Sequence, residues 1–262
     1  MLSLLGVLFC LGCDVRPVAT AMPADVELVL AVDVSRSMDA DEFALQRAGY
    51  VEAIRHPDFI NAVRAGRNGR IAIAYFEWAG TVRRESLVPW QVIDSPESAQ
   101  AFAAALAGRP FGGYTGTSIS GALDFGNGLF DDNSVDGLRR VIDVSGDGPN
   151  NIGLPVTGAR DRAVAAGIIV NGLPIIIRPS PTFSELDRYY AECVIGGEGS
   201  FMLPIRSVDE FATAIRRKLI LEVSGATPPA IVIPAAGEPV DCLKGERDRR
   251  FFSDPYFPEL DR

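Results

Sequence analysis

The most constraining feature of this chain is a short apolar run at residues 28–32 that ends directly in Asp33. A run of this length, without polar alternation and rich in branched side chains, is typical of a strand buried on both faces of a parallel sheet. In open α/β sheets, ligands bind beyond the carboxyl ends of the strands. We therefore expect Asp33 to lie at the rim of such a sheet, where binding sites form.

Two serines, Ser35 and Ser37, follow Asp33 at alternate positions. Together with the carboxylate they offer only oxygen ligands, which suit a hard divalent cation such as Mg²⁺, Mn²⁺ or Ca²⁺. The alternative is helix capping, because serine and aspartate are favoured N-caps and a helix is predicted soon afterwards, at residues 39–55. Taken alone, this short motif leaves both interpretations open.

Two further loops carry oxygen-bearing side chains. A glycine-rich stretch at residues 111–118 contains Thr115 and Thr117 and leads into a predicted helix, and an apolar strand at residues 140–145 is followed by Asp147. Three junctions therefore supply carboxylates and hydroxyls, in the order Asp-x-Ser-x-Ser, Thr and Asp-Gly. The combination is more specific than any one of its parts.

In this three-part pattern the chain resembles the von Willebrand factor A (vWA) domain family and its metal-ion-dependent adhesion site, the MIDAS. The resemblance implies a bound divalent metal, with Mg²⁺ preferred and Mn²⁺ or Ca²⁺ as alternatives. The metal ligands that it implies are Asp33, Ser35, Ser37, Thr117 and Asp147. Thr115 stays open as the alternative to Thr117, which we prefer because it directly precedes the helix.

A second resemblance is to the DUF1194 group of bacterial secreted vWA-like proteins, and it covers roughly residues 25–224. It rests on stretches such as GTSISGALDF, RRVIDVSGDGPNN and YYAECVIGG. Most members of that group carry Gly-Gly-Gly-Thr where this chain has Gly113-Tyr-Thr-Gly-Thr117. This departure is the reason why two threonines are candidates.

The predicted strands alternate with helices, which indicates a parallel sheet covered on both faces. After the first strand, strands are expected at residues 70–78, 140–145, 167–177 and 200–203, with an edge strand at 81–89. Helices are expected at residues 39–55, 95–106, 161–166, 184–190 and 208–221, and directly after Thr117. With the resemblance, the expected fold is a Rossmann-like, three-layer α/β vWA fold whose mostly parallel central sheet has one antiparallel edge strand.

The two ends of the chain are interpreted separately from this vWA-like domain at residues 25–224. Residues 1–12 are apolar but too short to span a bilayer as a helix, and we interpret residues 1–21 as a signal peptide. The alternative is a lipobox that ends at a lipidated Cys13. Both predict export to the periplasm or beyond, with membrane contact only through a lipid anchor. Residues 225–262 are interpreted as a proline-rich extended tail.

Predictions can also be made for two cysteines, one glutamate and one cluster of charged residues. Cys193 and Cys242 either pair in an oxidising compartment or remain free thiols, because sequence spacing does not establish distance in space. Glu77 is expected to be a solvated charge at a strand end, with a place near the metal rim as the alternative. The charge cluster at residues 244–250 is expected to be a solvated surface.

The net charge of −9 argues against nucleic acid and anionic membrane surfaces as partners. The function predicted is metal-dependent, non-catalytic recognition of a protein or peptide that supplies an Asp or Glu carboxylate. The first alternative is a metal-dependent hydrolase or phosphoryl-transfer enzyme. For Ser118 or Ser145 as its nucleophile, however, the single histidine, His56 beside Pro57, offers no evident base. The second alternative is a structural domain with a purely stabilising metal site.

Overall fold

The computed structural model describes residues 21–35, 40–109, 114–131, 133–178, 183–226 and 239–252. Four predictions lie wholly or mainly outside these residues: the signal peptide, the lipobox cysteine Cys13, the metal ligand Ser37 and the proline-rich tail at 225–262, of which only 225–226 and 239–252 are described. Within the described residues, no helix is long and apolar enough to cross a membrane.

In the described part of the chain, five strands form one sheet in the order β3-β2-β1-β4-β5. They are β1 (Met22–Asp33), β2 (Ile71–Trp78), β3 (Val82–Ile93), β4 (Val135–Gly146) and β5 (Ile168–Pro174). β1 pairs in parallel with both β2 and β4, β4 pairs in parallel with β5, and only β3 is antiparallel. The predicted mixed sheet with one antiparallel edge strand is confirmed, and β1 is its central strand.

The prediction of a strand at residues 200–203 is wrong. This segment runs beside β5 and forms only isolated bridges, between Gly172 and Met202 and between Ile175 and Ile205. Gly197 and Gly199 adopt positive φ angles immediately before it, which turns the backbone away from an extended ladder. The segment therefore follows the sheet edge without becoming a sixth strand among the described residues.

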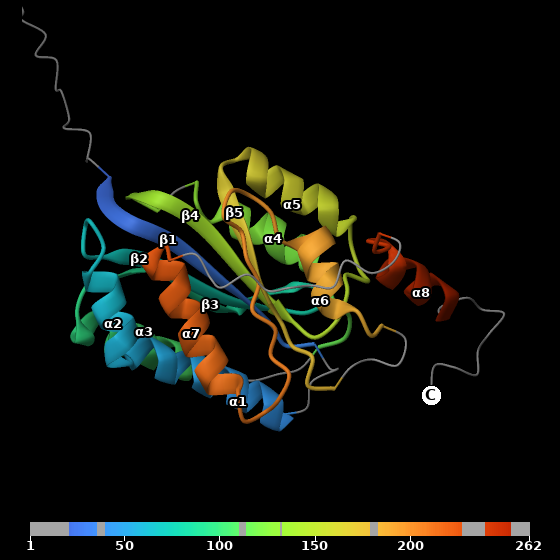
Figure 1. Ribbon diagram of the computed structural model, residues 1–262, viewed down its shortest axis with the longest axis horizontal. Coiled ribbons are helices and arrows are strands. Elements are labelled where there is room, and N and C mark those ends of the chain that lie inside the picture. Colours follow the sequence, from blue (N-terminus) through green and yellow to red (C-terminus); the bar gives the residue numbers. More distant parts are fainter. Residues whose placement is uncertain are drawn as a thin grey trace, which may run out of the picture.

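Helices cover both faces of the sheet (Figure 1). One face carries α1 (Ala40–Arg55), α2 (Pro57–Arg64), α3 (Pro96–Ala107) and α7 (Phe211–Ser224). The other carries α4 (Ile119–Gly128), α5 (Val156–Ala165) and α6 (Leu186–Tyr189), which continues as a π-helix, η1 (Tyr190–Val194). Alternate residues of β1 enter two separate cores, Leu28 and Leu30 the first and Val29 and Ala31 the second. This two-sided burial explains why the strand has no polar alternation.

The residues around His56 form two helices where one was predicted. The helix predicted at residues 39–55 corresponds to α1, which ends at Arg55, and Pro57 is the first residue of a second helix, α2. Proline suits that first position, because its missing N–H would have no helical partner there. The His56 imidazole caps α2 by accepting a hydrogen bond from the backbone N of Asp58 at 3.1 Å.

Glu77 corrects another expectation, because this residue is buried and not solvated. Its Oε1 accepts a hydrogen bond from Arg47 Nε at 3.1 Å and another from the Tyr75 hydroxyl at 2.9 Å. A buried carboxylate is tolerated when it is paired and hydrogen-bonded in this way. Glu77 therefore joins α1 to β2 inside the first core.

The C-terminal region contains a disulfide, which is one of the two alternatives that the sequence left open, and a helix that the sequence did not predict. Cys193 of η1 and Cys242 are bonded, with their Cα atoms 5.6 Å apart. Helix α8 (Lys244–Phe252) follows, and Gly245 packs so closely on the backbone carbonyl of Asn150 that a Cβ there would overlap it. The Glu246 carboxylate accepts a hydrogen bond from Asn150 Nδ2 at 2.8 Å. Residues 244–250 are thus a helix docked on the domain.

We expect Cys242→Ser to lower the free energy of unfolding by about 2–4 kcal/mol, because the disulfide joins residues 49 positions apart and restricts the unfolded chain. Urea unfolding followed by circular dichroism measures the change. A reductant should lower the wild-type midpoint and leave the variant unchanged. Equal midpoints for the oxidised wild type and the variant would contradict the prediction.

Candidate metal centre

The first loop of the site begins at Asp33, the last residue of β1. Asp33 is fully buried, and its Oδ1 accepts a hydrogen bond from the backbone N of Ser35 at 2.7 Å. Its Oδ2 is buried and has no hydrogen-bond partner within the described part of the chain. A buried, half-satisfied carboxylate is costly unless a further donor or a cation compensates it.

The electrostatic surroundings of Asp33 are unfavourable to its charge. Burial raises the pKa of the Asp33 carboxyl well above its usual range, and the nearby Asp147 carboxylate raises it further. The backbone N–H and the hydroxyl of Ser35 and the nearby backbone N–H of Asp147 lower this pKa, but they do not offset the rise. Two acidic groups thus lie near each other at a place where a divalent cation would favour the charged form of both.

Thr117, in the second loop, is buried and faces the third loop. Its backbone N donates to Asn151 Oδ1 at 2.9 Å, and its carbonyl accepts from the backbone N of Asn151 at 2.8 Å. A Cβ added to Gly148 would lie 4.0 Å from the Thr117 hydroxyl. Thr115 is exposed, and its carbonyl accepts a hydrogen bond from Gly80 at the end of β2. These positions favour Thr117 over Thr115 as the candidate ligand.

The third loop brings Asp147 to the same rim as Asp33. Asp147 follows the last residue of β4, and its Oδ1 lies 3.5 Å from the Ser35 hydroxyl, which donates to it. The structure therefore gathers four of the five predicted ligand residues at the carboxyl ends of β1 and β4: Asp33, Ser35, Thr117 and Asp147. The fifth, Ser37, lies outside the described residues.

The donor set fits a hard divalent cation. All of its side-chain donors are carboxylate or hydroxyl oxygens, the ligands that Mg²⁺, Mn²⁺ and Ca²⁺ accept. Neither at this site nor elsewhere do the described residues contain a group of three or more His, Cys, Asp or Glu side chains that could hold a metal ion. The candidate site consists of two carboxylates plus hydroxyls, and the Asp33 Oδ2, which has no partner among the described residues, is the observation that agrees best with it.

Two asparagines that the sequence analysis missed hold the second and third loops together. Asn150 is fully buried; its Oδ1 accepts from the backbone N of Ser120 in the first turn of α4 at 2.9 Å. Asn151 bonds Thr117 through both its side chain and its backbone. The sequence does contain a feature that indicates this role: Asn150 and Asn151 follow directly after Asp147-Gly-Pro, and asparagine side chains readily hydrogen-bond to nearby backbone groups.

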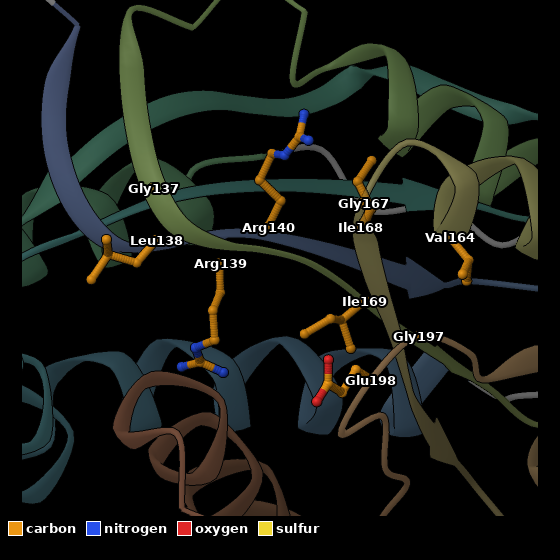
Figure 2. Close-up of a pocket in the computed structure, with 10 residues that line it drawn as sticks. All are labelled: Gly137, Leu138, Arg139, Arg140, Val164, Gly167, Ile168, Ile169, Gly197 and Glu198. Atoms are coloured by element: carbon orange, nitrogen blue, oxygen red, sulfur yellow. The ribbon is translucent and has the colours of Figure 1, made fainter.

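A separate cavity of about 430 Å³ lies at the opposite end of the strands, near the starts of β4 and β5 (Figure 2). Its two arginines, Arg139 and Arg140, point to opposite sides of β4 (Figure 2). Arg139 donates to the carbonyl of Glu222 at 2.7 Å, and Arg140 donates to the carbonyl of Ala166 at 2.6 Å. Each guanidinium thus satisfies a carbonyl near the C-terminal end of a helix, and the two do not converge on one ligand.

The sheet order, the two helical layers and the three-loop rim define a vWA fold. Similar solved structures include von Willebrand factor type A from Catenulispora acidiphila, with a TM-score of 0.54, 16% identity, and 76% of this chain and 43% of that chain covered. The proximal thread matrix protein 1 from the mussel byssus, solved with a zinc-occupied MIDAS motif, has a TM-score of 0.58 and 14% identity, covering 78% of this chain and 49% of that chain. The pilus adhesin SpaC from Lactobacillus rhamnosus GG in its open conformation has a TM-score of 0.53 and 14% identity, covering 76% of this chain and 30% of that chain.

The chain belongs to the family described as "Protein of unknown function (DUF1194)", whose profile matches residues 23–227. This confirms the second resemblance. No curated protein matches the sequence. The chain spans about half or less of each of the three solved chains, and at 14–16% identity the likeness to them shows the fold alone.

Proposed function

We propose that this protein binds a divalent metal ion, Mg²⁺ in preference to Mn²⁺ or Ca²⁺, and uses it to recognise a protein or peptide that supplies an Asp or Glu carboxylate. The proposed ligands are Asp33, Ser35, Ser37, Thr117 and Asp147. The observation that carries the proposal is the buried Asp33 carboxylate, whose Oδ2 has no partner among the described residues and which lies near a second carboxylate and two hydroxyl-bearing loops.

The composition of the site supports recognition by an incompletely neutralised ion. The proposed set holds only two carboxylates, whereas an EF-hand loop surrounds its ion with more carboxylates and fills the coordination shell from its own chain. When bound, the ion would supply a Lewis-acidic position for a partner's carboxylate. The residues of this chain would hold the ion from three loops and leave its outer side toward the partner.

The roles of Ser118 and His56 support a non-catalytic function. The Ser118 hydroxyl is the N-cap of α4 and accepts a hydrogen bond from the backbone N of Gly121 at 3.2 Å. His56 caps α2 directly after the end of α1, whereas the residue of α1 that contacts the site is Gln46, which donates to the Asp33 carbonyl at 2.9 Å. The ten residues from Gln46 to His56 correspond to about 15 Å along the helix, so the imidazole lies well away from the site. EDTA-sensitive phosphatase or esterase activity would contradict this part of the proposal.

Export is also part of the proposal. The Cys193–Cys242 disulfide supports it, because structural disulfides persist in oxidising compartments and are rare in the cytosol. A byssus matrix protein and a pilus adhesin among the structures of similar fold are compatible with a role outside the cytoplasm. We propose cleavage of residues 1–21, with lipidation at Cys13 as the alternative, a vWA-like domain at residues 25–224 and a C-terminal segment at 225–262.

Metal-dependent capture of a partner tests the proposed function. Immobilised protein should retain a partner from an envelope extract in Mg²⁺ and release it in EDTA. Thr117→Ala should lose this retention, because it removes a proposed ligand, whereas the matched variant Thr115→Ala should keep it, because Thr115 is not a proposed ligand and its contact with Gly80 is made by its backbone carbonyl. Retention that ignores both EDTA and Thr117→Ala would overturn the proposal.

A further inference from the structure

The Tyr190 side chain lies beneath the candidate metal centre. Tyr190 is fully buried, and its hydroxyl is one of the buried polar groups that have no hydrogen-bond partner within the described residues. A Cβ added to Gly146 would lie 2.8 Å from the Tyr190 hydroxyl and 3.0 Å from Asp33 Oδ2. Two unpartnered oxygens therefore border the same small space beside Gly146.

The surrounding structure fixes the Tyr190 ring in this position. Tyr190 is the first residue of η1, and π-helical turns are rare and frequently occur at functional sites. The ring packs tightly against Gly172 of β5, where there is no room for a Cβ. The adjacent Tyr189 accepts a hydrogen bond from the backbone N of Asn150 at 3.1 Å, so the other hydroxyl of the pair supports the third loop. The tyrosine pair thus contacts the rim from the side of η1.

We propose that Tyr190 is a positioning residue of the metal centre, whose hydroxyl donates a hydrogen bond to Asp33 Oδ2 when the site holds a cation. The inference rests on the proposed metal-binding function. Metal ligands are commonly oriented by such outer hydrogen bonds, and loss of one typically costs 10–100-fold in metal affinity. Oδ1 already accepts from the backbone of Ser35, so Tyr190 would supply the donor for the second oxygen.

Tyr190→Phe tests this role because it removes the hydroxyl and keeps the ring. Isothermal titration with Mn²⁺ or Mg²⁺ should show an affinity about 10–100-fold weaker than that of the wild type. The melting temperature in EDTA should stay equal or rise, because the deleted oxygen is buried without a partner in the metal-free structure. A purely structural tyrosine would give unchanged affinity, and that result would overturn the inference.

The matched control is Tyr75→Phe, which removes a buried hydroxyl from the opposite face of the sheet. That hydroxyl donates to Glu77 at 2.9 Å, so its loss should lower the melting temperature in EDTA and leave metal affinity unchanged. The two variants therefore have opposite expected patterns. If the wild type binds neither ion, the proposed function itself fails. If the wild type binds and Tyr190→Phe binds equally well, only the role of Tyr190 fails.

Discussion

Asp33→Ala should abolish divalent-ion binding, with a loss greater than the roughly 100-fold upper range for removal of an outer hydrogen-bond partner. Asp33 is one of two carboxylates in the proposed set, and its backbone is fixed by the central strand of the sheet. Without its charge, Asp147 and neutral hydroxyls alone would face a doubly charged ion, and they would not compensate for the loss of the ion's hydration shell.

Isothermal titration with Mg²⁺ and Mn²⁺ measures this loss, and a thermal melt with and without EDTA checks it independently. The control is Asp136→Ala, which removes an exposed carboxylate near the other end of β4 and should leave the titration as in the wild type. Wild-type affinity in the Asp33 variant would show that the ion, if any, is held elsewhere.

Lys218→Met should lower the free energy of unfolding by about 3–5 kcal/mol, the largest stability effect that we expect for a single substitution. Lys218 is buried; its Nζ lies 2.7 Å from Asp143 Oδ1 and 2.5 Å from Glu222 Oε1. Methionine would fill similar space but leave two carboxylates buried without their cation. Asn171 would still donate to Glu222 at 2.7 Å, but a neutral amide does not balance two negative charges.

The pH dependence of this effect has a definite sign. Burial raises the pKa of Glu222 even in the wild type, where Lys218 opposes the rise. Without Lys218 this pKa should rise further. A carboxyl whose pKa is higher when folded than when unfolded contributes stability at low pH and loses it as the pH rises through the folded value. The loss in free energy of unfolding caused by Lys218→Met should therefore be smaller in mildly acidic than in mildly alkaline buffer.

Guanidinium unfolding in the two buffers measures both effects of the substitution. The matched control is Lys244→Met, which removes a partly exposed lysine 3.0 Å from Asp248 in α8. Exposed i,i+4 pairs of this kind are worth about 0.3–0.5 kcal/mol, so the control should change little. Similar losses for the two variants would contradict a stabilising role of the buried cluster.

The features predicted correctly from the sequence were those encoded within one segment. The apolar run before Asp33 predicted a central buried strand because both faces of β1 meet a core. The helix predicted at residues 95–106 is α3, and it begins where the Ser95 hydroxyl accepts from the backbone N of Ser98. Thr117 and Asp147 lie in different loops, so the prediction that they lie close together depended on the family resemblance as well.

Features that depend on contacts between distant segments were not predictable in this way. Lys218 and Glu222 look like ordinary surface charges of an amphipathic helix, and only the packing of α7 on β4 and β5 places them beside Asp143. Helix α8 was missed because its sequence is short and charged, and isolated helices of that length are marginal in water. The disulfide at Cys242 and the close packing of Gly245 supply the missing stabilisation.

The bond between Cys193 and Cys242 also changes what backbone cleavage does to this molecule. A single cut by a protease anywhere between the two cysteines would leave both fragments covalently joined, so the mass would change only by the water taken up. The fragments would separate on a gel only after reduction. A preparation that looks intact without reductant can therefore contain nicked chains whose terminal helix is still attached.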